Sequence, residues 1–292
     1  MRAAAALAVA ALLPREGAVG QDATTVPLIT RLPSSVRSAA LGGSGVALTG
    51  YAGAVFDNPS AVAPLRVTTA ELAWSDYAAG SGQGMGAMSL RAGAFTLAGG
   101  AQYLKFPDTA GVKDNLTWVA AGVYRGGLGA LGVGVRYVSI EDTAGLVNRA
   151  LTTDAGLTFA FFDIAALAVA VQGIGTLRAT GEKLDLPLTT RLGFTLNFVD
   201  PQGVPRLLTT IESVWTEGEE HRWRGGIEGG IASPSVGLLL RVGAAEVPEE
   251  SGLSSMSYGG GLVFPGFTVD YAYQHRNAFG SPVHRLGLRF SP

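Results

Sequence analysis

Leu131-Gly132-Val133-Gly134-Val135-Arg136-Tyr137 is the stretch that decides the fold. Large apolar residues alternate in it with glycine or arginine, so an extended strand would carry one apolar face and one small or polar face. The same period of two returns at residues 191–198, 268–274 and 285–290. Because alternation of this kind runs from residue 66 onward, the sequence predicts an all-β domain over residues 66–292.

Composition places this domain in a membrane. Charged residues make up 15% of the chain and hydrophobic residues 47%, whereas a soluble domain normally carries about 25% charge. Past the N-terminus, no stretch approaches the roughly 18 uninterrupted apolar residues that a spanning helix needs. Since lipid-exposed backbone must satisfy its own hydrogen bonds, a closed barrel is the remaining solution.

Three further features separate an outer-membrane barrel from a soluble β-sandwich or barrel, which would show the same period. The polar faces hold mostly Gly, Ala and Ser, and Lys occurs only at positions 105, 113 and 183. Aromatic residues gather near the ends of the expected strands, where interface girdles lie. The links alternate between long and short, as extracellular loops and periplasmic turns do.

We therefore predict a transmembrane antiparallel up-and-down β-barrel of about fourteen strands in the outer membrane, with both ends of the chain in the periplasm. Twelve or sixteen strands stay open as alternatives. The expected strands are 67–76, 85–91, 95–104, 116–124, 128–138, 151–160, 164–172, 188–198, 206–215, 221–231, 235–243, 254–263, 266–275 and 284–290.

The N-terminal residues differ from the barrel. Arg2, an apolar run at 3–13 and a small-x-small site at 18–20 predict a cleaved signal peptide over residues 1–20. Residues 21–65 lack long alternation and carry a turn signal at Asn58-Pro59. We expect this part to form a compact segment with one short helix, separate from the barrel at 66–292.

No motif nominates catalysis. Gly127 to Gly132 match G-x-G-x-x-G, but the match runs into a strand and not into a helix, which disfavours a dinucleotide site. His221, His275 and His284 show no metal-like spacing, and the chain has no Cys. A net charge of −2 offers no basic face for nucleic acid. We expect no cofactor, metal or enzymatic activity, although a Ser-His-Asp hydrolase stays open because such groups meet only in space.

Charges on the expected inward faces form the first set of candidate site residues. Inside a barrel, such charges hold a plug in place or line a polar path. Arg222, Arg224 and Glu228 share one face of one strand, and we favour a mutual salt-bridge ladder among them over contact with substrate. The candidate lumen charges are Arg136, Arg191, Arg222, Arg224, Glu228, Asp270 and Arg289.

The N-terminal segment also carries a family resemblance. Residues 38–48 (SAALGGSGVAL) and 53–63 (GAVFDNPSAVA) resemble the opening of FadL-like outer-membrane proteins, closest in style to the PorV/PorQ branch. Ser60 stands where those openings usually have Ala after Asn-Pro. The resemblance implies a fourteen-stranded barrel with the segment folded into the lumen as a hatch. The candidate hatch residues are Ser38, Leu41, Gly42, Gly43, Gly45, Phe56, Asn58 and Pro59.

The resemblance also implies transport without chemistry. The PorV branch serves type IX secretion and receives C-terminal domains of exported cargo, and the short chain with modest loops favours this branch. The FadL branch takes up hydrophobic molecules, which bind near the hatch and leave sideways through the wall. A FadL-like importer and a structural or adhesive surface barrel are the alternatives. The expected partners are outer-membrane lipid and either a secreted protein cargo or a hydrophobic small molecule.

Overall fold

The computed structural model describes most of the chain. The described residues are 27–65, 68–77, 80–106, 115–141, 147–161, 164–180, 184, 186–199, 204–233, 235–247, 254–276 and 280–292. The expected signal peptide at 1–20 lies outside them.

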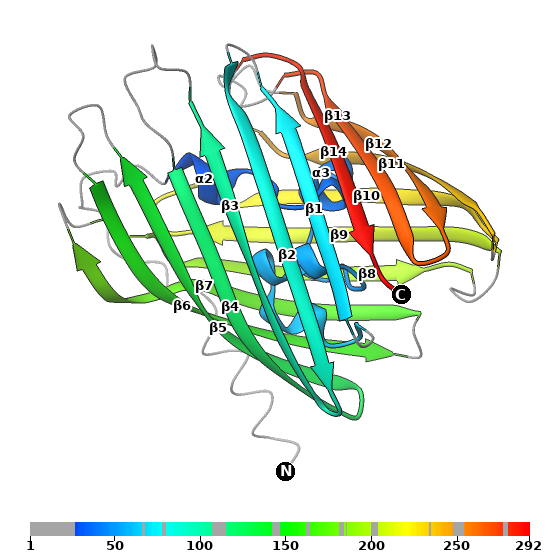
Figure 1. Ribbon diagram of the computed structural model, residues 1–292, viewed down its shortest axis with the longest axis horizontal. Helices are drawn as coiled ribbons and strands as arrows, with labels where there is room; N and C mark the ends of the chain where they lie inside the picture. Colours follow the sequence, from blue (N-terminus) through cyan, green and yellow to red (C-terminus); the bar gives the residue numbers. More distant parts are fainter. Residues whose placement is uncertain are drawn as a thin grey trace.

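Fourteen antiparallel strands form one closed barrel, in which each strand pairs with its neighbours in the chain and β1 pairs with β14 (Figure 1). The all-β antiparallel barrel of about fourteen strands predicted from the sequence is thereby confirmed. The strands are β1 (Thr68–Asp76), β2 (Gly82–Ala92), β3 (Phe95–Lys105), β4 (Asn115–Gly126), β5 (Gly129–Glu141), β6 (Val147–Phe161), β7 (Ala165–Thr180), β8 (Thr189–Asn197), β9 (Pro205–Thr216), β10 (Arg222–Ala232), β11 (Gly237–Ala245), β12 (Met256–Phe264), β13 (Phe267–Gln274) and β14 (Val283–Phe290).

The two ends of the barrel differ in their connections. The links after even-numbered strands are mostly short, such as 93–94 and 265–266, and we call this the short-turn end. The links after odd-numbered strands include the long ones at 106–114 and 246–255, and we call this the long-loop end. β1 begins and β14 ends at the short-turn end, which is the arrangement that an even number of antiparallel strands requires.

The strands present two chemically different faces. On the outward face, large apolar side chains are mostly exposed, as at Leu97 (66% exposed), Leu240 (63%) and Leu286 (59%). On the inward face, alternate residues are small, polar or charged, and most are buried. A lipid environment satisfies both faces, because it accepts the apolar belt and leaves polar groups to pair inside. Among the described residues, the helices are all too short to cross a bilayer.

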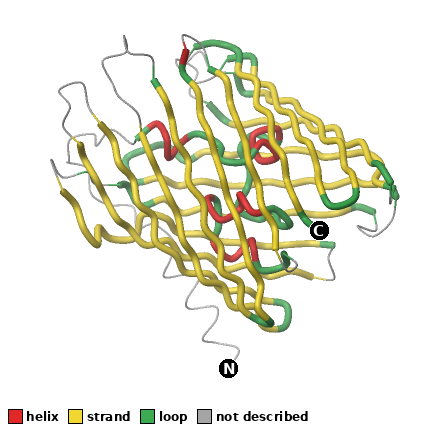
Figure 2. Tube along the Cα trace, viewed as in Figure 1, coloured by secondary structure: helices red, strands yellow, loops and turns green. Residues whose placement is uncertain are grey.

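Residues 27–65 lie inside the barrel, and we call them the inner segment (Figure 1, Figure 2). The expectation of one short helix here is wrong. The segment contains two short α-helices, α2 (Leu28–Arg31) and α3 (Val36–Ala40), and two 3-10 helices, η1 (Ala52–Phe56) and η2 (Pro59–Val62). Side-chain caps explain two of them, because Ser35 accepts a hydrogen bond from the backbone at the start of α3 and Asn58 does so at η2.

Inward glycines make room for the inner segment. A Cβ atom added to Gly243 of β11 would lie 2.0 Å from the backbone nitrogen of Gly42. One added to Gly132 of β5 would lie 2.6 Å from the backbone nitrogen of Ser60. Such approaches exclude any side chain, so glycine on these strands lets the segment's backbone pack directly on the wall.

Candidate functional site

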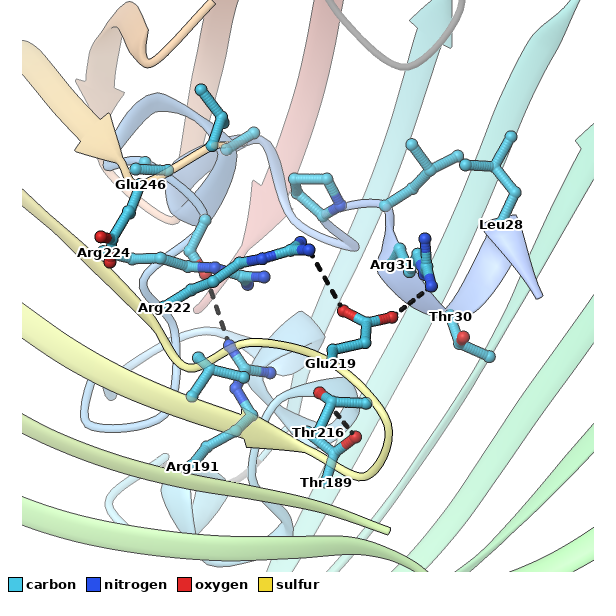
Figure 3. Close-up of a pocket in the computed structure, with 18 of the residues that line it drawn as sticks. Leu28, Thr30, Arg31, Thr189, Arg191, Thr216, Glu219, Arg222, Arg224 and Glu246 are labelled. Atoms are coloured by element: carbon cyan, nitrogen blue, oxygen red, sulfur yellow. Dashed lines mark hydrogen bonds and ion pairs between the residues drawn. The ribbon is translucent and has the colours of Figure 1, made fainter. Parts of the chain in front are cut away.

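The interior of the barrel holds the inner segment with a cavity on either side of it. The cavity at the long-loop end measures about 290 Å³ and reaches from α2 to the ends of β9 and β10 (Figure 3). The cavity at the short-turn end measures about 660 Å³ and lies against Thr49, Gly50 and Ala63 of the segment. The candidate functional site therefore consists of two chambers and the segment between them.

One ion-pair cluster ties the segment to β8 and β9. Arg191 of β8 donates from Nε to Glu212 of β9 at 2.7 Å and from Nη1 to Asp57 of the segment at 2.7 Å. Glu212 also accepts from the backbone nitrogens of Gly45 at 2.7 Å and Val46 at 3.0 Å. Glu212 is 1% exposed, so its carboxylate has no water around it. Four protein N–H groups take the place of water: the two backbone nitrogens and two nitrogens of the Arg191 guanidinium.

A second cluster runs across β10, β11, β13 and β14 with alternating charge. Arg37 of the segment donates to both oxygens of Glu228, at 2.8 and 3.0 Å, in a bidentate pair. Arg241 joins Glu228 to Asp270, with contacts of 2.5 and 2.6 Å. Arg289 then pairs with the other oxygen of Asp270 at 2.5 Å. The segment thus supplies the first charge of a chain that continues along the wall.

Two smaller contacts hold the middle of the segment. Arg136 of β5 pairs with Asp154 of β6 at 2.8 Å and also donates to the backbone oxygen of Phe56 at 2.8 Å. Glu71 of β1 has no basic partner within ion-pair distance in the described residues. It accepts instead from Ser35 Oγ at 2.6 Å and from the backbone nitrogen of Gly53 at 2.9 Å.

The Asn-Pro turn is fastened by its own side chains. Asn58 donates to the backbone oxygen of Val46 at 2.8 Å and to Thr158 Oγ1 of β6 at 3.1 Å. Ser60 Oγ lies 2.7 Å from the same Thr158 hydroxyl.

Nearby, burial raises the pKa of the Tyr51 phenol well above its ordinary value. The Asp57 and Glu71 carboxylates raise this pKa further, so the tyrosine stays neutral.

The candidate hatch residues all lie inside the barrel in close contact with its wall or with one another. Leu41 is fully buried, and Gly42 and Gly43 adopt positive φ angles of 74° and 80°, where glycine is favoured. The Gly42 nitrogen donates to Ser257 Oγ at 3.0 Å, and Gly45 contacts Glu212 as described above. The buried Ser38, Phe56, Asn58 and Pro59 complete the set. Their role as a hatch stays a prediction.

The expected ladder among Arg222, Arg224 and Glu228 is wrong. Glu228 pairs with Arg37 and Arg241, whereas Arg222 faces Glu219 at 3.5 Å. Residues two apart on a strand do point to the same face, as expected. However, charged groups on neighbouring strands, in the adjoining link and in the inner segment lie closer to these side chains than they lie to one another. The other candidate charges, Arg136, Arg191, Asp270 and Arg289, do lie in the interior clusters.

Several charged residues of the clusters were missing from the candidate set. Arg37 and Asp57 of the segment were overlooked because they lie outside the strands, where no alternation of apolar and polar residues shows which side chains face the interior. Glu212 and Arg241 stand at inward positions of β9 and β11, where the period of two does place them on the polar face, although the candidate set left them out.

His221 makes the closest approach to a catalytic pair. Its Nε2 contacts Ser213 Oγ, and its ring stacks on Trp215. However, Ser213 is only 2% exposed although it stands on the outward face, so its hydroxyl is not accessible to a substrate. Among the described residues, no group of three or more His, Asp or Glu is placed to hold a metal ion.

Comparison with known proteins supports the fold. No family model matches the chain, and neither does any curated protein. Among solved structures, it is similar to the CymD monoaromatic hydrocarbon channel, with TM-score 0.61, 11% identity, and 89% of this chain and 97% of that chain covered.

Two further structures resemble it to the same degree. The toluene transporter TbuX of Ralstonia pickettii has TM-score 0.60 and 10% identity, with 89% of this chain and 97% of that chain covered. A FadL homologue of Pseudomonas aeruginosa has TM-score 0.58 and 12% identity, with 88% and 98% covered. At these identities the likeness shows a shared fold, the FadL-type barrel.

Proposed function

We propose that this chain is an outer-membrane channel that lets small, mainly apolar molecules pass through its interior without chemistry. The observation that carries the proposal is the cavity of about 660 Å³ at the short-turn end, which lies within the size range of ligand sites. Its wall is dominated by apolar and small side chains. They include Ala47, Ala63, Pro64, Leu128, Ala130, Ala160, Ala166, Leu207, Leu208, Leu239 and Val263.

Two other features support this function. The outward apolar belt suits a bilayer, and the expected signal peptide suits export to the outer membrane. Solved structures of the same fold carry the titles of hydrocarbon channels and toluene transporters, which names a substrate class worth testing. Because the inner segment stands between the two cavities, passage along the interior requires this segment to shift.

Toluene uptake by host cells tests the proposal. Cells with an outer membrane that express the chain should take up radiolabelled toluene faster than cells with an empty vector. Host cells are preferable to liposomes, because toluene dissolves readily in plain phospholipid bilayers. Equal rates in the two kinds of cell would contradict the proposal.

A reversible lock tests the movement of the segment. The chain contains no Cys, and Ser60 Oγ lies 2.7 Å from Thr158 Oγ1, so S60C/T158C places two thiols within reach of a disulfide. Oxidation should slow toluene uptake, and dithiothreitol should restore it, whereas the single variant S60C should ignore both reagents. Uptake that is unaffected by oxidation would show that the segment need not move away from β6.

A second candidate function is the handling of secreted protein cargo, as in the PorV/PorQ branch. The feature that favours it is the amino-acid sequence of residues 38–48 and 53–63, which resembles the N-terminal opening of proteins in that branch. The presence of type IX secretion components in the same organism is the first check. The direct test is whether the chain restores export of a cargo with a C-terminal secretion domain in a host that lacks its own PorV. Failure to restore export would leave the channel as the better account.

A further inference from the structure

The outward aromatic residues differ between the two ends of the barrel. All four tryptophans and all three histidines of the chain lie on or beside the outward face near the long-loop end, and most of the outward tyrosines join them. At the short-turn end the described outward aromatic residues are phenylalanines, with Tyr124 as the exception. The girdle at the long-loop end is therefore rich in ring N–H and O–H groups, whereas the other girdle is nearly devoid of them.

The densest part of the long-loop girdle lies on β12, β13 and β14, which are neighbours in the wall (Figure 1). Tyr258, Tyr273 and His284 stand opposite one another on these three strands. The ring centroid of His284 lies 5.2 Å from that of Tyr273 and 6.2 Å from that of Tyr271. His275 follows β13 directly. We call these five residues the tyrosine–histidine patch.

Hydrogen bonds orient both imidazole rings of the patch. Tyr271 Oη lies 2.8 Å from His284 Nδ1, and Tyr273 Oη lies 3.1 Å from His275 Nδ1. We assign the phenols as donors, so each neutral imidazole carries its proton on Nε2. Within the described part of the chain neither Nε2 makes a hydrogen bond. Both histidines are exposed, so two N–H groups are left to donate to a molecule outside the wall.

The third histidine lacks this arrangement. His221 stacks on Trp215 in the same girdle, but its Nε2 already contacts Ser213 Oγ. The two unused N–H donors of the girdle's histidines are therefore confined to the tyrosine–histidine patch.

The charged neighbours of the patch narrow the kind of group that it fits. Asp76 of β1 stands opposite His284, and Arg276 follows His275; both are exposed. The patch thus combines donors with an anionic acceptor. Sugar hydroxyls both donate and accept, and the C–H face of a sugar ring packs on exposed aromatic rings. A phosphate group only accepts hydrogen bonds and would be repelled by Asp76. The mixed set of groups favours a sugar.

The surface next to the patch shows what accompanies the sugar. Towards the short-turn end, the same three strands present exposed Leu262, Val269, Leu286 and Leu288 on the outward face. These side chains belong to the apolar belt, which suits acyl chains and which a free sugar would not use. Because the patch stands where the belt meets the long loops, its occupant combines a sugar with acyl chains.

We propose that the tyrosine–histidine patch binds the sugar headgroup of a glycolipid in the outer leaflet, with the acyl chains along β12, β13 and β14. The long loops place this end of the barrel at the extracellular side. The proposal depends on the membrane placement of the barrel and not on transport through it, so it can fail or stand independently of the channel.

Native mass spectrometry of the full chain in an uncharged detergent tests the ligand class. The probes are glucosyl dioleoylglycerol and dioleoyl phosphatidylglycerol, which share their acyl chains and differ in the headgroup. The glycolipid should bind at least about fivefold more tightly, which is roughly the worth of one net hydrogen bond. Equal affinity for the two lipids, or tighter binding of phosphatidylglycerol, would overturn the proposal.

Variants locate the site. H284F keeps a ring but removes the N–H donor, and Y271F removes the hydroxyl that orients this imidazole. Each should weaken glycolipid binding by about fivefold and leave phosphatidylglycerol binding unchanged. Y137F is the matched control, because Tyr137 lies in the same girdle on β5, where it stacks on Trp118 at 5.5 Å between ring centroids.

The gel shift of the closed barrel confirms that each variant is folded. Glycolipid affinity that is unchanged in H284F and Y271F, or that falls equally in Y137F, would overturn the assignment to this patch. A parallel fall in phosphatidylglycerol affinity would also overturn it, because it would indicate a general loss of lipid contact and not the loss of a sugar site.

Discussion

The outward and inward faces of the barrel follow opposite rules. On β11, Leu238, Leu240 and Val242 point outward with large exposed fractions, and any apolar side chain would serve there. The alternating residues Arg241 and Gly243 point inward, where Arg241 joins two carboxylates and Gly243 touches the backbone of the inner segment. The outward face requires a class of residue, whereas the inward face requires particular residues with particular partners.

The largest effect is expected from removing the inward partner altogether. Deletion of residues 35–65 should leave a closed barrel, because the ladder of β1 to β14 does not depend on the segment. The interior would then be joined from end to end, so ion conductance in planar bilayers should rise severalfold over the full chain. Heat-modified migration on gels checks that the barrel has closed. Unchanged conductance would contradict the hatch prediction.

The difference between the faces also explains what could be predicted from the sequence. Period-two alternation and loop rhythm are local, and they placed all fourteen strands, including β5 around 131–137. The interior partners are not local. Arg37 pairs with a carboxylate 191 residues away, and Arg191 pairs with one 134 residues away. A single sequence contains the charges but not their pairing, which is why the ladder expected within β10 was wrong.

A buried carboxylate should be the most costly single change. E212Q removes the charge that faces Arg191 and weakens the acceptor for Gly45 and Val46. Breaking a buried pair typically costs about 3–5 kcal/mol of unfolding free energy, and urea unfolding in detergent measures it. E220Q is the control, because Glu220 is exposed in the nearby link and the chemical change is identical. A similar loss in both variants would refute a special role for the Glu212 cluster.

The outward face should respond to charge and tolerate apolar change. L240R places a guanidinium in the middle of the belt and should cost about 2–4 kcal/mol in a bilayer. L240F keeps the face apolar and should be nearly neutral. Folding into phospholipid vesicles, followed by the gel shift of the closed barrel, compares the two. If the arginine variant were the more stable one, the outward face would be in water, and the membrane placement would be wrong.

The smallest effect is expected from two adjacent threonines on β9, one on each face. Replacing each of them by valine compares the loss of one inward hydroxyl with the loss of one outward hydroxyl. Thr210 points inward, is 2% exposed, and shares hydrogen bonds with Ser44 at 3.0 Å and Thr195 at 3.1 Å. T210V keeps the shape but leaves the Ser44 hydroxyl without this partner, so it should cost about 1 kcal/mol. Thr209 lies on the outward face opposite Leu196 and Ile227, so T209V should be neutral or slightly stabilising in lipid. Unfolding free energies measured side by side decide the matter, and equal values would mean that the inward hydroxyls contribute no specific bonding to the segment.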